Sequence, residues 1–411
     1  MTEETNMHFL IVDDDKTSAE MHAAMLEKAG HKTTVITSSK AALAQVATLA
    51  PDCIISDLIM PELDGIGFFQ AVRKISMPKQ PTFIILTSKV FEFDRRRAFE
   101  MGVDGYLTKP PHPDTFVNDL IEIINKEVIV QFWGVRGTLP VPGENTVHYG
   151  GNTNCVTLTL GRKHFFIFDA GTGIKRLSNY LIAQNKFPMS AKIFISHPHY
   201  DHINGIPFFA PLYMKGNEFD FYGAPYGDIT IEKIITGQMD SIYFPITTKE
   251  FAAKINFHDL KEETFNIDEV QIQTMLLNHP GSCLGYRVQY NNKVFCYITD
   301  HELYLEDAPY YNQFDVDRLL NFINAADVLV IDSTYTDSQY IAKIGWGHSC
   351  ISRVVDIADK AKVKLLCLYH HDPDQLDKDI DFKVNEAKQL LESHHSNTHC
   401  IAPREDEKIV L

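Results

Sequence analysis

AKIFISHPHYDH, which spans Ala191–His202, is the stretch that indicates most about the structure of this chain. Its first five residues form a largely apolar run, which predicts a buried strand. Alternation then places His197 and His199 on one side of the chain, and the turn that follows brings Asp201 and His202 to a second position. One histidine alone is more often a core or surface residue. The HxHxDH spacing at a strand end instead predicts a metal site, and imidazole with carboxylate suits Zn²⁺, Mn²⁺ or Fe²⁺.

Further candidate ligands stand at the ends of three other expected strands. They are His279 after residues 270–277, Asp300 after residues 293–299, and His370 or His371 after residues 363–369. One residue from each of these strand ends brings the set to five histidines and two aspartates, enough for two metal ions about 3.5–4 Å apart. We interpret the other histidines near these runs as surface residues or as neighbours of a ligand: His258, His301, His394, His395 and, of the doublet, His371.

Composition limits the class of protein. The 411 residues suffice for two or three domains, and 45% hydrophobic with 22% charged residues is typical of a globular chain. Apolar runs stay shorter than the ~18 residues of a membrane helix, so we expect a cytoplasmic protein without a signal peptide. Seven cysteines without CxxC pairing indicate reduced thiols. The formal charge of −16 disfavours nucleic acid as a partner, because phosphates require a basic face.

An alternating β/α pattern occupies the first part of the chain, where only four of the 18 histidines lie. The expected strands are Phe9–Val12, Thr33–Ile36, Cys53–Ser56, Thr82–Leu86 and Gly105–Leu107. Apolar residues at three- and four-residue spacing fill the segments between them, which predicts a parallel, doubly wound (βα)5 domain of α/β class. Ligands of such sheets bind beyond the carboxyl ends of the strands. There the sequence places Asp13, Asp14, Asp15, Asp57, Thr87, Ser88 and Lys109.

Three carboxylates in one crevice repel each other unless a divalent cation neutralises them, and oxygen-only ligands suit Mg²⁺. A carboxylate beside Mg²⁺, a hydroxyl and a lysine is well placed to accept a phosphoryl group. Each of these residues alone would more often be a solvated surface residue. Their presence at successive strand ends predicts a phosphorylation site.

These residues resemble the receiver domain of bacterial two-component response regulators. The motifs are Val12-Asp13-Asp14-Asp15, Asp57-Leu-Ile-Met60-Pro61, Gly65, Leu86-Thr87 and Leu107-Thr108-Lys109-Pro110. The resemblance implies a receiver domain over residues 1–126 with these roles: Asp57 as phospho-acceptor, Asp13, Asp14 and Asp57 as Mg²⁺ ligands, Thr87 and Tyr106 as switch residues, and Lys109 as the phosphate partner. It also implies a cis Lys109–Pro110 bond and a sensor histidine kinase as phosphodonor.

The second part, residues 127–411, resembles the metallo-β-lactamase-fold hydrolases, with most likeness to the ribonuclease Z and phosphoribosyl cyclic phosphodiesterase branch. Supporting motifs are Phe132-Trp-Gly-Val-Arg136-Gly, Tyr149-Gly-Gly-Asn152-Thr-Asn154, Asp169-Ala-Gly-Thr-Gly173, Asp332-Ser-Thr-Tyr335-Thr and Gly345-Trp-Gly-His348-Ser. The resemblance implies an αβ/βα sandwich and these ligands: His197, His199 and His279 for one metal, Asp201, His202 and His370 for the other, and Asp300 between them. His370 is preferred over His371 because Leu366-Cys-Leu-Tyr-His370 aligns with the strand before the family's last ligand.

The implied chemistry is phosphodiester hydrolysis. Two adjacent cations generate hydroxide at neutral pH and clamp the oxygens of an in-line displacement. We expect Asp201 and His348 to be catalytic, because the histidine of this Gly-His-Ser motif faces the scissile phosphate in the related phosphodiesterases. A general acid typically contributes ~10²–10⁴-fold. The alternative is that His348 only caps the helix that begins near Ser349.

Three classes of function fit these residues. The leading one is a response regulator whose output is a dinuclear phosphodiesterase, acting on a cyclic nucleotide or other small cyclic phosphate and controlled by phosphorylation of Asp57. The second is an RNA-processing endonuclease of ribonuclease Z type, which the acidic balance and the lack of an obvious RNA-clamping arm disfavour. The third is a non-enzymatic, receiver-gated interaction module, which the complete ligand set disfavours. A β-lactamase is expected less still, because Asp300 stands at the bridging position.

The two parts join without a Gly/Ser or Pro-rich linker. The helical run Thr115–Asn125 passes through Lys126-Glu127 into the strand-like Val128–Phe132. A near-rigid junction favours coupling between the parts, and the alternative is a fusion with little communication. The aromatic-rich residues 211–260 could stack a nucleobase, form a homodimer interface or fill a small core, and we favour the core.

Overall fold

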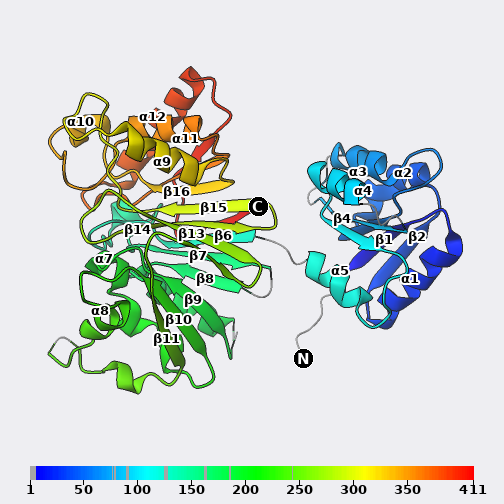
Figure 1. The fold of residues 1–411 in the computed structure, drawn as a ribbon, viewed down its shortest axis with the longest axis horizontal. Coiled ribbons are helices and arrows are strands. Elements are labelled where there is room, and N and C mark those ends of the chain that lie inside the picture. The colour runs from blue at the N-terminus through cyan, green and yellow to red at the C-terminus, as the bar shows by residue number, and fades with distance from the viewer. Residues whose placement is uncertain are drawn as a thin grey trace. The chain divides into compact units, whose positions relative to one another are not determined.

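The computed structural model describes residues 6–75, 77, 80–88, 92–124, 128–161, 164–184, 187–242 and 244–411. The chain divides into two compact units, Met1–Lys126 and Glu127–Leu411 (Figure 1). The predicted junction at residues 125–127 lies outside the described residues. Among the helices of the described part, none has both the length and the apolar character needed to cross a membrane.

The first unit is a five-stranded parallel sheet in the order β2-β1-β3-β4-β5, which confirms the doubly wound α/β prediction. Its strands are β1 (His8–Val12), β2 (Lys32–Ile36), β3 (Cys53–Ser56), β4 (Thr82–Thr87) and β5 (Gly105–Thr108). Its helices are α1 (Lys16–Lys28), α2 (Ser39–Leu49), α3 (Gly65–Arg73), α4 (Glu92–Glu100) and α5 (Phe116–Ile124). Alternate residues of β1 enter two different apolar clusters, so both faces of the sheet are buried.

The second unit contains two mixed sheets of seven strands each. The first runs β11-β10-β9-β8-β7-β6-β19 and the second β12-β13-β14-β15-β16-β17-β18. The first comprises β6 (Val128–Gly134), β7 (Cys155–Leu160), β8 (His164–Phe168), β9 (Ser190–Phe194), β10 (Glu218–Gly223), β11 (Lys254–Asp259) and β19 (Lys408–Val410). The second comprises β12 (Thr264–Ile267), β13 (Val270–Leu276), β14 (Leu284–Tyr290), β15 (Lys293–Ile298), β16 (Val328–Asp332), β17 (Leu365–Tyr369) and β18 (His399–Ile401).

Helices cover the outer faces of both sheets, which confirms the αβ/βα sandwich. They are α6 (Gly173–Ala183), α7 (Tyr200–Ile203), α8 (Ile231–Gly237), α9 (Gln313–Ile323), α10 (Asp337–Tyr340), α11 (Ile351–Lys360) and α12 (Asp377–Ser393). Short 3-10 turns occur at Glu144–Thr146, Ile206–Phe208, Ala210–Tyr213 and Thr248–Glu250. Figure 1 shows α9, α11 and α12 together on one side of the second sheet.

Two apolar cores hold these layers together. The larger core fills the space between the sheets and continues under α9, α11 and α12, and the smaller one lies between the first sheet and α6 and α8. Phe219 and Phe221 of β10 are fully buried in the smaller core, as favoured for the aromatic-rich stretch. The parallel strands of both sheets, β8 to β11 and β15 to β18, leave their carboxyl ends available for polar residues.

Candidate metal centre

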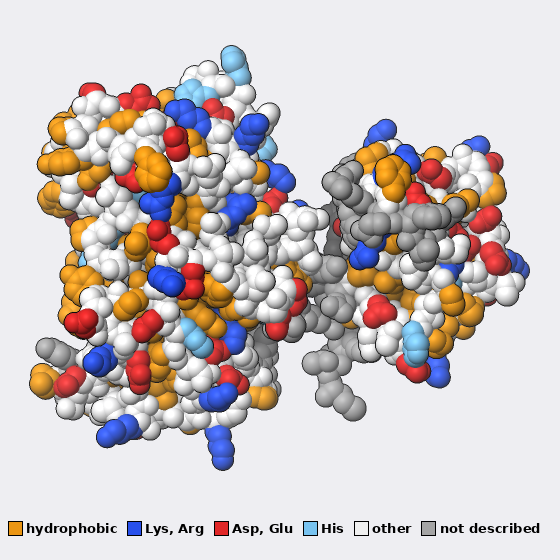
Figure 2. Space-filling view, in the orientation of Figure 1, with side chains coloured by type: hydrophobic (Ala, Val, Ile, Leu, Met, Phe, Trp, Pro, Cys, Tyr) orange, Lys and Arg blue, Asp and Glu red, His pale blue; other side chains and the backbone are white. Residues whose placement is uncertain are grey.

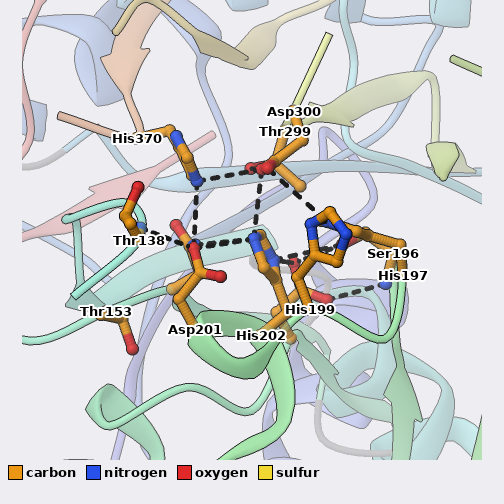
Figure 3. Close-up of polar contacts among 12 residues, drawn as sticks. Thr138, Thr153, Ser196, His197, His199, Asp201, His202, Thr299, Asp300 and His370 are labelled. Carbon is orange, nitrogen blue, oxygen red and sulfur yellow. Dashed lines mark hydrogen bonds and ion pairs between the residues drawn. The ribbon is translucent and has the colours of Figure 1, made fainter. Parts of the chain in front are cut away.

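The predicted ligands of the second unit follow the ends of four strands drawn from both sheets. β9 leads into the HxHxDH stretch, and α7 begins directly after His199, which is its N-cap. β13, β15 and β17 lead into His279, Asp300 and His370. Because these strands belong to the same sandwich, side chains far apart in the sequence meet at one place (Figure 3).

A first group contains His197, His199, His279 and Asp300, and their ligand atoms all lie within 4.8 Å of one another. Nε2 of His197 is 2.8 Å from Nδ1 of His199, which is 3.3 Å from Nε2 of His279. Three imidazole nitrogens that point at one another in this way are typical of a site that a cation fills.

A second group contains Asp201, His202 and His370. Oδ2 of Asp201 lies 3.1 Å from Nε2 of His202 and 3.2 Å from Nε2 of His370. The backbone N–H of Thr138 donates to the same oxygen at 2.8 Å and holds the carboxylate in place. Figure 3 shows these contacts of Asp201 with Thr138, His202 and His370 as dashed lines.

Asp300 joins the two groups with one oxygen for each. Its Oδ2 is 3.6 Å from Nε2 of both His197 and His279. Its Oδ1 is 3.1 Å from Nε2 of His202 and 3.0 Å from Nε2 of His370. A carboxylate shared in this way is the geometry expected of a bridge between two metal ions.

Burial sets the protonation of the first group. It lowers the pKa of His197 well below its ordinary value, with a further contribution from the neighbouring His202. Burial also lowers the pKa of His199 and of His279. These imidazoles are therefore neutral at pH 7, which is the form that binds a metal.

The second group is held by opposite charges in a buried place. Burial raises the pKa of Asp300, but His370 and His202 outweigh it and bring that pKa well below its usual range. Burial likewise opposes the charge of Asp201, and His202 again outweighs it. The carboxylates in turn raise the pKa of His202 well above its ordinary value, against its own burial. The nitrogen and oxygen donors of the whole set fit two divalent transition metal ions.

Residues behind the ligands fix the orientation of the rings. Oδ2 of Asp169 lies 2.8 Å from Nδ1 of His202 and accepts a hydrogen bond from the hydroxyl of Tyr297. Asp169 therefore orients the ring of His202. The carbonyl of Gly347 lies 2.9 Å from Nδ1 of His279, and the hydroxyl of Thr334 lies 3.2 Å from Nδ1 of His370. Such partners orient a metal-binding ring.

The two histidines of the doublet point in different directions. His370 faces the second group, whereas Nδ1 of the buried His371 lies 3.0 Å from Nζ of Lys383. A Cβ on Gly137 would come within 2.2 Å of the His370 ring, so only glycine fits at that position. The close approach explains one glycine of the FWGVRG motif.

His348 lies beside the two groups and forms a third cluster with Asp300 and His370. Its ring stacks on that of His370 at 4.9 Å between centroids, and its Nδ1 is 2.6 Å from Oδ2 of Asp332. Burial lowers the pKa of His348, but Asp332 outweighs it and raises this pKa to about 9. His348 precedes α11 by more than one residue, and the N-cap of that helix is Cys350.

Three residues near the centre were not among the predicted site residues. Nδ2 of Asn154 lies 3.1 Å from Nε2 of His202, and Glu302 accepts hydrogen bonds from the loop before His348. The ammonium of Lys383 donates to the carbonyls of residues 333 and 334, beside the last ligand. Asn152 instead donates to Glu405 and has a structural place in its loop. The only sequence signal for Glu302 was its place two residues after the predicted ligand Asp300, which does not reveal its contact with the loop.

The crevice of the first unit also assembles as predicted. Asp13, Asp14 and Asp57 bring oxygen atoms within 4.8 Å of one another, which fits Mg²⁺. Nζ of Lys109 donates to Asp13 at 2.7 Å and to Asp57 at 2.6 Å. Burial lowers the pKa of Lys109, but these hydrogen bonds outweigh it and raise the pKa. Asp15 is not part of this crevice, because its side chain accepts from two backbone N–H groups and caps α1.

The switch positions lie next to the crevice in the sheet. Thr87 ends β4 and is buried, and Tyr106 of β5 is buried as well. The Lys109–Pro110 peptide bond is cis, as the sequence predicted.

Comparisons with known proteins give a separate match for each of the two units. Residues 9–121 match the family described as response regulator receiver domain, and residues 164–371 match the beta-lactamase superfamily domain. Ribonuclease Z of Lactococcus lactis subsp. cremoris (strain SK11) is 27% identical over 305 residues, which cover 63% of this chain and 94% of that protein. The alkaline phosphatase synthesis transcriptional regulatory protein PhoP of Bacillus subtilis (strain 168) is 34% identical over 110 residues, 26% of this chain and 44% of that protein.

One solved structure supports the fold of the second unit. The metallo-beta-lactamase fold protein YhfI from Bacillus subtilis has a TM-score of 0.51 at 16% identity, and the match covers 69% of this chain and 100% of that one. At this identity the likeness concerns the fold alone.

Proposed function

We propose that this chain, which belongs to the beta-lactamase superfamily and carries a response regulator receiver domain, hydrolyses small phosphodiesters such as cyclic nucleotides and related cyclic phosphates. Its relatives of ribonuclease Z type confirm the branch that the motifs predicted. A hydrolase is the activity class that this membership and the two groups of ligands support.

The observation that carries the proposal is the position of Asp300. One of its oxygens faces His197 and His279, and the other faces His202 and His370. Two divalent cations, when bound, lower the pKa of a water molecule and stabilise the charge of an in-line displacement at phosphorus. Zn²⁺, Mn²⁺ and Fe²⁺ are the candidates, because the donors are imidazole and carboxylate.

The residues around the centre have distinct tasks in this proposal. His197, His199 and His279 would hold one cation, and Asp201, His202 and His370 the other, with Asp300 between them. Asp201 would also accept a proton from the attacking water. His348 keeps Nδ1 on Asp332, which leaves Nε2 to donate a proton to the departing oxygen. With a pKa raised to about 9, His348 is protonated at pH 7 and suits this role.

Cleavage of RNA is the second candidate function, favoured by the ribonuclease Z relative that matches over 94% of its length. Charge argues against it. Residues 127–411 contain 36 acidic and 25 basic residues, a formal charge of −11. A protein that binds many phosphates by electrostatic attraction usually presents a basic surface.

A substrate panel tests the proposal. Purified full-length protein is supplied with Mn²⁺ or Zn²⁺ and assayed on bis(p-nitrophenyl) phosphate, cyclic mononucleotides, cyclic dinucleotides and precursor tRNA. We expect turnover of the small diesters. Turnover of precursor tRNA alone would move the assignment to RNA, and no turnover of any diester by folded, metal-loaded protein would reject the hydrolase.

We further propose that phosphorylation of Asp57 by a sensor histidine kinase controls this activity. The contacts of Lys109 with Asp57 and Asp13 support Asp57 as the acceptor, since a lysine there would bind the phosphoryl oxygens. Beryllofluoride, a phosphoryl mimic, is expected to change the hydrolysis rate or the oligomeric state of the wild-type protein. The Asp57→Asn variant should not respond, and an equal response in both proteins would contradict the assignment.

A further inference from the structure

Trp346 is an exposed tryptophan next to the metal centre. The chain has two tryptophans, of which Trp133 is 1% exposed and Trp346 is 60% exposed. Trp346 lies between α10 and α11, two residues before His348. Figure 2 shows hydrophobic side chains at the surface over α10. Ile341 and Ile344 of the same segment are also exposed, and exposed apolar side chains that gather in one segment indicate a binding surface more strongly than a single one does.

The loop that carries Trp346 is fixed to the interior. The carboxylate of Glu302, which is 3% exposed, accepts hydrogen bonds from the backbone N–H groups of Gly345 and Gly347, both at 2.7 Å. The hydroxyl of Tyr340 donates to the same carboxylate at 2.8 Å. These three bonds hold the backbone of the loop on both sides of Trp346.

The same loop contacts a predicted metal ligand. The carbonyl of Gly347 lies 2.9 Å from Nδ1 of His279, and a Cβ on this glycine would come within 2.3 Å of that atom. The loop that carries Trp346 is therefore in direct contact with the metal centre.

Two ring contacts and the ammonium of Lys343 link the metal centre with the exposed indole. His370 stacks on His348, and Tyr335 meets His348 edge-on at 5.9 Å between centroids. The ammonium of Lys343 lies 4.9 Å from the centroid of Tyr335 and 4.6 Å from that of Trp346. Lys343 thus presents a positive charge between Tyr335 and the indole, where the two rings and the carboxylate of Asp372, 3.8 Å from its Nζ, hold it.

We propose that Trp346 and Lys343 form a subsite for the nucleobase and an anionic oxygen of a nucleotide substrate. Lys343 covers part of the indole, and the exposed remainder can stack a planar base, as aromatic side chains do in proteins that bind nucleotides. The ammonium would attract an anionic oxygen of the substrate whose base stacks on Trp346. This inference rests on the proposed function and specifies the substrate class as a nucleotide diester, from either a cyclic nucleotide or the end of an RNA.

Tryptophan fluorescence tests the subsite without turnover. AMP is titrated into the metal-loaded full-length protein, with ribose 5-phosphate as the probe that lacks a base. We expect saturable quenching by AMP and little by ribose 5-phosphate, because only AMP has a base that can stack on the indole. The buried Trp133 supplies a constant background, so the change in fluorescence reports on Trp346. Equal quenching by both probes, or none by AMP, would overturn the subsite.

Variants extend the test to binding measured by calorimetry. Trp346→Ala should weaken AMP binding roughly 5- to 150-fold, the range expected for loss of one stacked base. Trp346→Phe should restore part of that loss. Phe314→Ala is the matched control, because Phe314 is 67% exposed and has the guanidinium of Arg318 6.0 Å from its ring, but lies on α9. An equal loss in the control, or none in Trp346→Ala, would contradict the assignment.

Failure of the subsite and failure of the proposed function give different results. Quenching by AMP without hydrolysis of any diester supports the subsite and rejects the hydrolase. Hydrolysis without quenching supports the hydrolase and rejects the subsite. The KM of Trp346→Ala, compared with that of the wild type, then distinguishes a cyclic nucleotide from the end of an RNA. The increase in KM should be larger for the true substrate, measured with a cyclic mononucleotide and with precursor tRNA.

Discussion

The two units neutralise clustered carboxylates in different ways. In the first unit, Lys109 bonds to Asp13 and Asp57 in a crevice whose third carboxylate, Asp14, is exposed. In the second unit, imidazoles surround Asp201 and Asp300, which are both buried. Open, oxygen-only sites suit Mg²⁺ that exchanges readily, whereas enclosed nitrogen and oxygen donors retain transition metals. The comparison therefore predicts a receiver site that responds to phosphorylation and Mg²⁺, and a separate centre in the second unit that retains its metals.

The largest expected effect follows from removal of the bridging carboxylate. Asp300→Asn should lower kcat for a cyclic mononucleotide by about 10³-fold or more, because several kcal/mol of charge stabilisation depend on both cations. Metal content, measured by elemental analysis, should fall below two ions per chain. Asp228→Asn, at an exposed position, is the control. A kcat of Asp300→Asn near the wild-type value would refute the bridging role.

The loss of kcat on replacement of His348 should depend on the leaving group of the substrate. His348→Gln should lower kcat at least about 10²-fold for a ribose alkoxide, which needs a proton as it departs. The loss should be smaller for bis(p-nitrophenyl) phosphate, because nitrophenolate departs without one. Metal content should remain that of the wild type. An equal loss on both substrates would argue that His348 has another role.

Lys383 gives a pH-dependent effect on stability in the second unit. Burial lowers the pKa of this lysine to about 7. The unfolded chain therefore holds a proton that the folded chain has lost between pH 7 and about 10.5, so this lysine makes a contribution to stability that rises with pH. Between pH 7 and 8.5 that contribution to the unfolding free energy is about 1.5 kcal/mol, opposed by His348 and His202, whose raised pKa values contribute stability that is lost as pH rises. Urea unfolding followed by tryptophan fluorescence reports on this unit, since both tryptophans belong to it.

Lys383→Met is the matched variant for this measurement. It should remove the contribution of the lysine, because methionine fills similar space without a proton to lose, while the titrations of His348 and His202 remain in both proteins. The unfolding free energy of the wild type minus that of Lys383→Met should therefore rise by about 1.5 kcal/mol between pH 7 and 8.5. An equal pH dependence in the two proteins would assign it to other groups.

The smallest effect separates neighbouring aspartates of the first unit. Asp15 caps α1, whereas Asp13 and Asp14 face the crevice. Asp15→Ala should cost about 1 kcal/mol of stability, the usual value of an N-cap, and leave Mg²⁺ affinity unchanged. Asp14→Ala should weaken Mg²⁺ binding with little change in the thermal transition of the full chain. Similar Mg²⁺ affinities in the two variants would contradict the division of roles.

The sequence was most informative where ligands are neighbours in the chain. His197, His199, Asp201 and His202 form one strand end and one turn, so their spacing alone predicted a common centre. The doublet required a structure, because the two histidines follow the end of β17, where His370 has a φ of 60°, and the fold directs one ring to the metal centre and its neighbour to Lys383. The sequence pattern could not settle which one, although the likeness to the family favoured His370.

Residues that act through distant partners were harder to predict. Glu302 stands 43 residues before Gly345 in the chain, and no local pattern reveals that its carboxylate holds that loop. Asn154 is 48 residues from His202, and its amide reaches the centre only because β7 and α7 come together in the folded sandwich. Such contacts depend on tertiary packing, which periodicity and motif spacing do not contain.

Anomalous diffraction from crystals of the metal-loaded full-length protein tests the central claim most directly. Data collected at the absorption edge of the bound metal should show two peaks about 3.5–4 Å apart, one among His197, His199 and His279 and one among Asp201, His202 and His370, with Asp300 between them. A single peak, or none at these residues, would contradict the dinuclear centre.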